Sequence, residues 1–318
     1  MKLDFIRLIA VCFLISSFSV HSQIVMLDTF ESADFLSTNS DGFMWESTNR
    51  TSIVNKDGVV NNGRVVNNPI ANGLNWDPRT PESADDVVGE HMMRYRYQPG
   101  ASWTEQRYDM GGAYPEVWIS YWIRVPRNYA RPSGTNNKWF NIWMGRSKNL
   151  YSADYENNNI SRIEMQDWPG SSNSMDINIQ FRNGSDGKYR NSNRYANFVT
   201  PADAGRWMKI LYHFKASSSN SADDGILRMY RRWHSEADYE LINDLTNLNV
   251  GVGSGSVAAG RLGWGAGYVM GYANAAYSEA TDWLLDDFTV ANHSLLGVNT
   301  PPLSSPPRPP ESLGASVD

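Results

Sequence analysis

The sequence predicts an all-β fold, a single-domain jelly-roll β-sandwich in which two antiparallel sheets pack together and one of them carries a polar concave groove. Three observations support this prediction. Apolar and polar residues alternate with period two in many segments, long helical periodicity is missing, and clusters of Gly, Asn, Ser and Asp between the segments are typical of turns. Strands with one apolar face bury that face by packing sheet against sheet.

Four segments show the alternation most clearly and are predicted to be half-buried strands: 117–126, 138–145, 161–168 and 175–184. In "KWFNIWMG" (138–145), the pattern directs Phe140, Ile142 and Met144 into the core and turns Trp139, Asn141 and Trp143 away from it. Further strands are expected at 91–97, 207–215, 226–233 and 283–291.

The two ends of the chain differ in composition from the middle. Residues 1–22 begin with Lys2 and Arg7 and continue through the apolar run "LIAVCFLISSFSV". This predicts a cleavable secretory signal with a mature start near Gln23, and an uncleaved anchor is the alternative. Residues 299–318 are rich in Pro and Ser, which predicts a disordered tail. We therefore expect one domain, residues 23–298, in a protein secreted to the periplasm or the exterior.

Composition argues against several classes of function. The 28 basic and 34 acidic residues are well mixed and give a net charge of -6, with no basic stripe for a nucleic acid. The one cysteine, Cys12, lies in the predicted signal, so we expect neither a disulfide nor thiol chemistry in the mature protein. We expect a monomer with no membrane span after the signal is removed.

An unusual row of side chains occurs in "SWTEQRYDMGG" (102–112), where Trp103, Glu105 and Arg107 share one face of an extended chain. Similar groups recur on the outward phase of other strands, and amides, guanidinium groups and aromatic rings suit a ligand rich in hydroxyls and carboxylates. The alternative is an exposed sheet decorated with ion pairs. The predicted saccharide-binding groove is lined by Trp103, Glu105, Arg107, Asn141, Trp143, Arg162, Glu164, Gln166, Asn178, Gln180 and Arg182.

Three phrases carry a resemblance to a known fold family: "LDTFESADF" (27–35), "WTEQRYDMGGAYPEVWISYWIRVP" (103–126) and "WLLDDFTVAN" (283–292). Over most of residues 27–295 the chain resembles the concanavalin A-like lectin/glucanase jelly rolls, and among them it is most similar to the secreted polysaccharide-lyase-like branch. The resemblance implies that the first and last strands lie side by side. It also implies activity toward polysaccharides.

The catalytic motifs of that fold are incomplete here. The Glu-x-Asp-x-x-Glu strand of laminarinase-type hydrolases has no match. Alginate-lyase jelly rolls carry Arg-x-Glu-x-Arg and Gln-x-His strands, whereas this chain has Trp103 in place of the first Arg and no histidine beside Asn141 or Gln180. If the protein is a lyase, Glu105, Arg107 and Gln180 are expected in the catalytic site, but the base must come from elsewhere.

Tyrosine is the better candidate for the base, since His91, His213, His234 and His293 are expected to be structural. The polar loop 186–198 holds Tyr189 and Tyr195, which we predict to be catalytic residues on a lid. The glycine-rich segment 263–277 offers Tyr268 and Tyr272 to a ligand. Aromatic packing is the alternative explanation for each of these tyrosines.

A cofactor is not expected to be required for catalysis. If the terminal strands pair, Asp28, Glu31, Asp286 and Asp287 lie close together, and such oxygen ligands suit a structural Ca²⁺ held by Glu31 and Asp287. Aspartates that accept turn amides are the alternative.

Three functions remain open. The first is a secreted lyase that cleaves an acidic, uronic acid-containing polysaccharide by β-elimination. The second is a non-catalytic, lectin-like carbohydrate-binding module, and the third is a glycoside hydrolase that uses Glu105 and Glu164 as its carboxylate pair.

Overall fold

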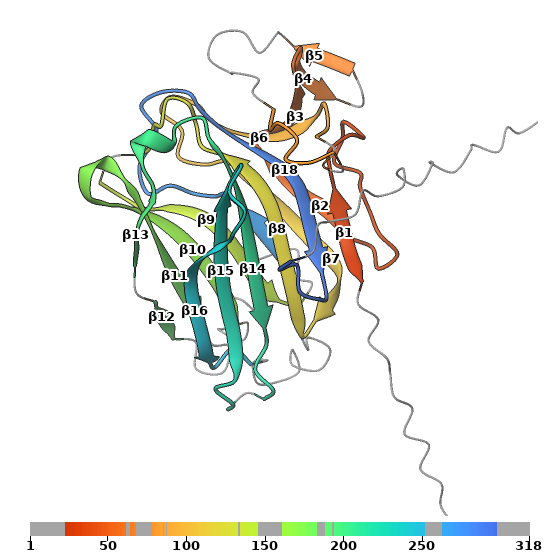
Figure 1. Ribbon diagram of the computed structural model, residues 1–318, viewed down its shortest axis with the longest axis vertical. Helices are drawn as coiled ribbons and strands as arrows, with labels where there is room; N and C mark the ends of the chain where they lie inside the picture. Colours follow the sequence, from red (N-terminus) through yellow and green to blue (C-terminus); the bar gives the residue numbers. More distant parts are fainter. Residues whose placement is uncertain are drawn as a thin grey trace, which may run out of the picture.

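The computed structural model describes residues 23–61, 64–67, 78–84, 86, 88–132, 134–145, 161–182, 188–192, 194–219, 221–251 and 263–297. Within them the chain folds into two antiparallel sheets packed face to face, as Figure 1 shows. The helical segments of the described residues are two short 3₁₀ turns, η1 (Ser171–Asn173) and η2 (Pro201–Asp203). The predicted all-β, jelly-roll β-sandwich is confirmed. The predicted signal (residues 1–22) and the predicted tail (residues 299–318) lie outside the described residues.

One sheet has ten strands. Its order is β16 (Glu240–Leu248), β15 (Gly225–Trp233), β14 (Trp207–Lys215), β8 (Glu116–Arg124), β18 (Thr281–Ala291), β6 (Met92–Tyr97), β3 (Thr51–Asn55), β4 (Gly58–Asn61) and β5 (Arg64–Asn67). The first strand, β1 (Ile24–Asp28), pairs with the last, β18, and places Asp28 opposite Phe288. The expected pairing of the terminal strands is therefore confirmed.

The other sheet has eight strands. Its order is β12 (Tyr189–Asn191), β11 (Met175–Arg182), β10 (Arg162–Pro169), β9 (Asn137–Met144), β17 (Trp264–Val269), β7 (Glu105–Tyr114) and β2 (Met44–Asn49). The remaining strand, β13 (Tyr195–Val199), also pairs with β11.

Aromatic side chains from both sheets form the core between them. Phe140 of β9 stacks on Tyr212 of β14 with ring centroids 4.4 Å apart, and Trp45 of β2 packs against Phe288 of β18 at 4.9 Å. Each fully buried large apolar side chain stabilises the fold by about 1.5–3 kcal/mol. The inward-facing side chains of the alternating strands thus hold the two sheets together.

A bulge in β9 changes the predicted orientation of its first residues. Asn141 lies opposite Glu164 and Phe140 opposite Met165, but the next pair is Lys138 with Gln166, so Trp139 is an extra residue. Its ring faces the core, where it packs edge-on against Trp283 with centroids 5.0 Å apart. The prediction that Trp139 faces outward is wrong, because the bulge reverses the phase of the strand at this residue.

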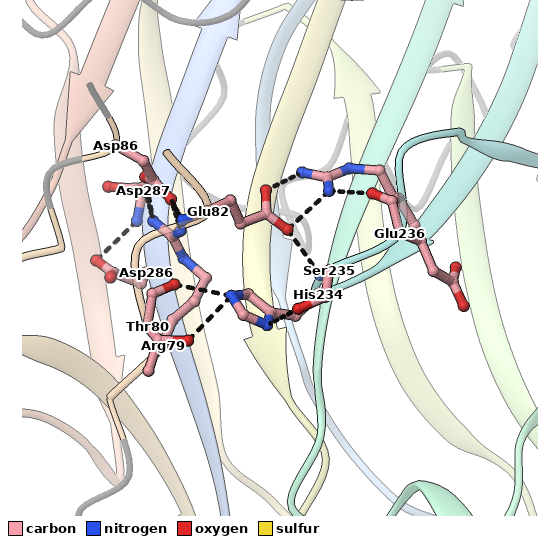
Figure 2. Close-up of polar contacts among 10 residues, drawn as sticks. Arg79, Thr80, Glu82, Asp86, His234, Ser235, Glu236, Asp286 and Asp287 are labelled. Atoms are coloured by element: carbon pink, nitrogen blue, oxygen red, sulfur yellow. Dashed lines mark hydrogen bonds and ion pairs between the residues drawn. The ribbon is translucent and has the colours of Figure 1, made fainter. Parts of the chain in front are cut away.

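The segment 78–84 lies across the outer face of the ten-stranded sheet (Figure 2). Arg79 stacks over Trp122 of β8, with its guanidinium carbon 4.5 Å from the ring centroid, and pairs with Asp86 and with Asp287 of β18. Glu82 pairs with Arg232 of β15. This segment, which we call the strap, occupies part of the outer face of the ten-stranded sheet.

Candidate functional site

A row of polar side chains crosses the outer face of the eight-stranded sheet. Residues directly opposite each other on paired strands share a face, and each member of the row lies opposite the next. From β2 to β12 the row is Glu46, Arg107, Tyr268, Asn141, Glu164, Gln180 and Asn191. We call this side of the sheet the polar face.

Two neighbouring rows complete the polar face. One runs through Asp109, Ala266, Trp143, Arg162 and Arg182, and the other contains the opposed residues Lys138, Gln166 and Asn178. The structure therefore brings together all the residues predicted on strands of the groove, although they come from four strands, β7, β9, β10 and β11.

Glu164 is the centre of this arrangement. Its Oε2 accepts hydrogen bonds from Asn141 Nδ2 and from the Tyr268 hydroxyl, each at 2.9 Å, and lies 3.5 Å from Lys138 Nζ. Its Oε1 accepts from Gln166 Nε2 at 2.5 Å. Burial by itself raises the pKa of this carboxyl, but the charges of Lys138 and Arg162 and these hydrogen bonds lower it below its usual value. Glu164 is therefore ionised at neutral pH.

The pKa of Tyr268 is shifted in the opposite direction. Burial, followed by the negative charge of Glu164, raises its pKa well above the usual value. The phenol is therefore protonated and donates its hydrogen to Glu164, while its oxygen accepts from Asn141 Nδ2 at 3.1 Å. The two residues form an acceptor and donor pair across β17, β9 and β10.

Glu105 links the residues of "SWTEQRYDMGG". Its Oε1 accepts from Arg107 Nε at 2.5 Å, and its Oε2 accepts from Trp103 Nε1 at 3.4 Å. Trp103 is 39% exposed, whereas Glu105 is buried. The row is thus a connected unit that presents an indole to solvent and holds the Arg107 guanidinium beside Tyr268.

The face is less open than the sequence led us to expect. Glu164, Asn141 and Trp143 are almost completely buried, although all three were predicted to line the groove. The reason is that neighbouring long side chains cover one another on the sheet. The side chain of Lys138 retains 29% of its exposure, and Arg107 and Gln180 are partly exposed.

Of the two predicted lid tyrosines, Tyr195 does not lie on the polar face. Tyr195 lies opposite Ile177, whose side chain is in the core, and its hydroxyl contacts Glu240 of the ten-stranded sheet. It is therefore on the inner side of its sheet, away from the polar face. The backbone of Tyr189 lies on β12 opposite Arg182, but its side chain is outside the described part of the chain.

The expected structural roles of the histidines agree with their contacts. His213 stacks on Trp118 and approaches Glu116, His234 contacts Thr80 of the strap, and His91 approaches Glu31. His293 approaches the carbonyl of Gln23. All four lie away from the polar face.

Lys138 and Gly271 belong to the site but were missed in the sequence. Strict alternation assigns Lys138 to the same side as Phe140, and only the bulge at Trp139 turns it toward Glu164. Gly271 lies close to Lys138 and Glu105, since a Cβ there would be 3.0 Å from Lys138 Cβ and 3.6 Å from Glu105 Oε2. Nothing in the sequence indicates the register shift at Trp139, whereas the glycine-rich segment that contains Gly271 was visible in it.

A buried polar cluster supports the polar face from behind. Asp167 accepts from the backbone N and the side-chain Nδ2 of Asn137, at 2.9 and 3.2 Å, and lies 3.7 Å from Arg131. The preceding Asn136 donates to Gln166, which in turn donates to Glu164. Burial, only partly offset by Arg131 and Asn137, raises the pKa of Asp167 to about 6.

The acids considered for calcium have protein partners. Asp28 accepts from Trp45 Nε1, Glu31 approaches His91, and Asp287 pairs with Arg79. Within the described ranges, no group of three or more His, Cys, Asp or Glu side chains is arranged to hold a metal ion. These contacts give the predicted calcium no ligand set there, and calcium binding stays a prediction. Nor does a helix long and apolar enough to cross a membrane occur among the described residues.

Solved structures that align with this chain include alginate lyases and the exoplasmic/lumenal domain of VIP36. The alginate lyase Aly36B has a TM-score of 0.47 at 12% identity, covering 77% of this chain and 97% of that chain. The alginate lyase vAL-1 from Chlorella virus has 0.38 at 9%, covering 68% and 91%. The metal-free exoplasmic/lumenal domain of VIP36 has 0.41 at 9%, covering 84% and 93%.

The strand order itself shows the two-sheet sandwich, whereas these alignments, all with TM-scores below 0.5, assign the chain to no superfamily. At these identities the likeness concerns the fold alone. No family model matches the sequence, and no curated protein matches it.

Proposed function

We propose that this protein is a secreted polysaccharide lyase that cleaves an acidic, uronic acid-containing glycan by β-elimination. The observation that carries the proposal is the ionised Glu164, which accepts a hydrogen bond from the Tyr268 hydroxyl at 2.9 Å and lies 3.5 Å from the Lys138 ammonium. An acceptor, a relay hydroxyl and a cation are thus assembled at the centre of one sheet face.

Elimination breaks the C–H bond next to the sugar carboxylate and the C–O bond to the leaving sugar. In the proposed reaction Tyr268 takes up the carbon-bound proton while it passes its own proton to Glu164, so the pair acts as the base. Lys138 protonates the leaving oxygen. Arg107 and Gln180, at either side of this centre, neutralise and orient the sugar carboxylate.

A non-catalytic glycan-binding module is the second candidate. The observation that favours it is the burial of Glu164 and Tyr268, which are 2% and 3% exposed, beside the exposed Trp103 and Tyr272. A surface of this kind binds sugars by stacking without requiring a reaction.

A hydrolase that uses Glu105 and Glu164 has less support. The two residues lie on β7 and β10, which are separated by β17 and β9, so three strand spacings of about 4.8 Å divide them. A glycosidase acid also needs a raised pKa to keep its proton, whereas the pKa of Glu164 is lowered.

The test is a screen of the purified protein on alginate, glucuronan, ulvan and glycosaminoglycans, following the ultraviolet absorbance of unsaturated uronate products. Tyr268→Phe should retain glycan binding and lower kcat by about 100-fold or more, the usual contribution of a positioned proton-transfer group. Tyr230→Phe, on β15 of the other sheet, is the matched control and should change nothing. Glycan binding without any product absorbance would favour the binding module.

A further inference from the structure

Two aromatic rings stand exposed at one end of the polar face. Of the Trp, Tyr and Phe side chains that the structure describes, only Trp103 and Tyr272 are exposed, at 39% and 46%. Most other tryptophans of the described segments are buried in the core or beneath the strap. Exposing two large rings costs burial free energy of about 1.5–3 kcal/mol for each, so the pair calls for an explanation.

The two rings are held side by side by the backbone. Trp103 and Tyr272 form an antiparallel bridge, so their side chains project to the same side. Arg50 Nη1 donates to the Trp103 carbonyl at 2.8 Å, and Lys138 N donates to the Tyr272 carbonyl at 3.1 Å. Ala273 N adds a bond to the Ser102 carbonyl at 2.7 Å. Both rings are therefore carried on an anchored backbone and form a preorganised platform.

The platform is continuous with the charged centre. Trp103 donates to Glu105, which pairs with Arg107, and Tyr272 follows Gly271 directly. A Cβ at Gly271 would lie 3.2 Å from Tyr268 Cε2 and 3.0 Å from Lys138 Cβ. Because Gly271 has no side chain, it places no atoms beyond its backbone between the platform and the centre formed by Lys138 and Tyr268.

We infer that Trp103 and Tyr272 form a stacking subsite for a pyranose ring that adjoins, in the same glycan chain, the uronate bound at Lys138 and Arg107. The apolar face of the ring lies on the aromatic pair, and its hydroxyls donate to the Glu105 carboxylate. This inference rests on the proposed function, because it places the ring next to the bound uronate. It adds that the protein recognises at least two consecutive sugars.

The experiment measures the affinity of the full chain for uronate oligosaccharides of increasing length by titration calorimetry. The Trp103→Ala/Tyr272→Ala variant should bind the longer oligosaccharides about 10-fold more weakly and lose the gain in affinity with length. Trp103→Phe/Tyr272→Phe, which keeps both rings, should stay close to wild type. The control is Leu241→Ala on β16, a side chain that is 46% exposed on the other sheet.

Each outcome is decisive. Equal affinity of the wild type and the double alanine variant overturns the subsite and leaves the proposed function standing. A wild-type protein that binds no uronate oligosaccharide overturns the proposed function and the subsite together. In a protein with lyase activity, the double alanine variant should raise KM while kcat stays the same, which separates it from Tyr268→Phe.

Discussion

The Asp167→Asn substitution should change how the stability of the protein depends on pH. Asp167 is completely buried, and its pKa is raised from 3.8 to about 6 in the folded state. In the unfolded chain it returns to its usual value. The folded protein therefore binds more protons than the unfolded chain between about pH 4 and pH 6, and stability falls as pH rises through this range.

The magnitude follows from the two pKa values. Their difference of about 2 corresponds to about 3 kcal/mol. Asp167 therefore makes the free energy of unfolding about 3 kcal/mol lower at pH 7 than at pH 3.5. An asparagine keeps an acceptor for Asn137 N and does not titrate. We therefore expect the variant to lose this part of the pH dependence.

The assay is urea unfolding of the wild type and the variant at a series of pH values from 3.5 to 7.5. The free energy of unfolding of the wild type, minus that of Asp167→Asn, should decrease by about 3 kcal/mol from the acidic to the neutral end. Asp244→Asn, an exposed carboxylate paired with Arg228, is the control and should leave the curve parallel to wild type. Parallel curves for Asp167→Asn would refute the reasoning.

Three further substitutions test other parts of the structure. Glu164→Gln leaves the Lys138 ammonium without its anionic partner, so it should abolish turnover and lower the free energy of unfolding by about 3 kcal/mol, measured by urea titration. Trp139→Ala should lower it by about 3–5 kcal/mol, because the ring is in the core; an effect under 1 kcal/mol would contradict the bulge. Arg79→Ala removes the cation that pairs with Asp86 and Asp287 and should lower the Tm without altering glycan affinity. A change in affinity would connect the strap to the site.

The sequence predicted the strands whose alternation is regular. The segment 207–215 was predicted with the bounds of β14, and 226–233 and 91–97 correspond to β15 and β6 within one residue. Alternation in a strand is a local property, because successive side chains point to opposite faces wherever the chain runs. The grouping of Trp103, Glu105 and Arg107 was predictable for the same reason.

β17 escaped prediction because its residues are dictated by neighbours that are distant in the sequence. A Cβ on Gly267 would lie 2.3 Å from the Asn141 carbonyl oxygen and from the Tyr108 hydroxyl, so this strand position admits only glycine. In the sequence, the glycines of "GWGAGYVMGY" resemble a loop instead. The strand that carries Tyr268 was therefore seen only as a glycine-rich segment.

The sequence by itself determined the fold class and most of the residues that share the polar face. It could not determine the orientation of Trp139 and Lys138, since a bulge depends on pairing with β10. Nor could it show that Glu164 is buried and ionised or that Tyr195 faces inward. Burial, charge and hydrogen bonding depend on side chains from strands far apart in the chain, and only the tertiary structure brings Lys138, Glu164 and Tyr268 together.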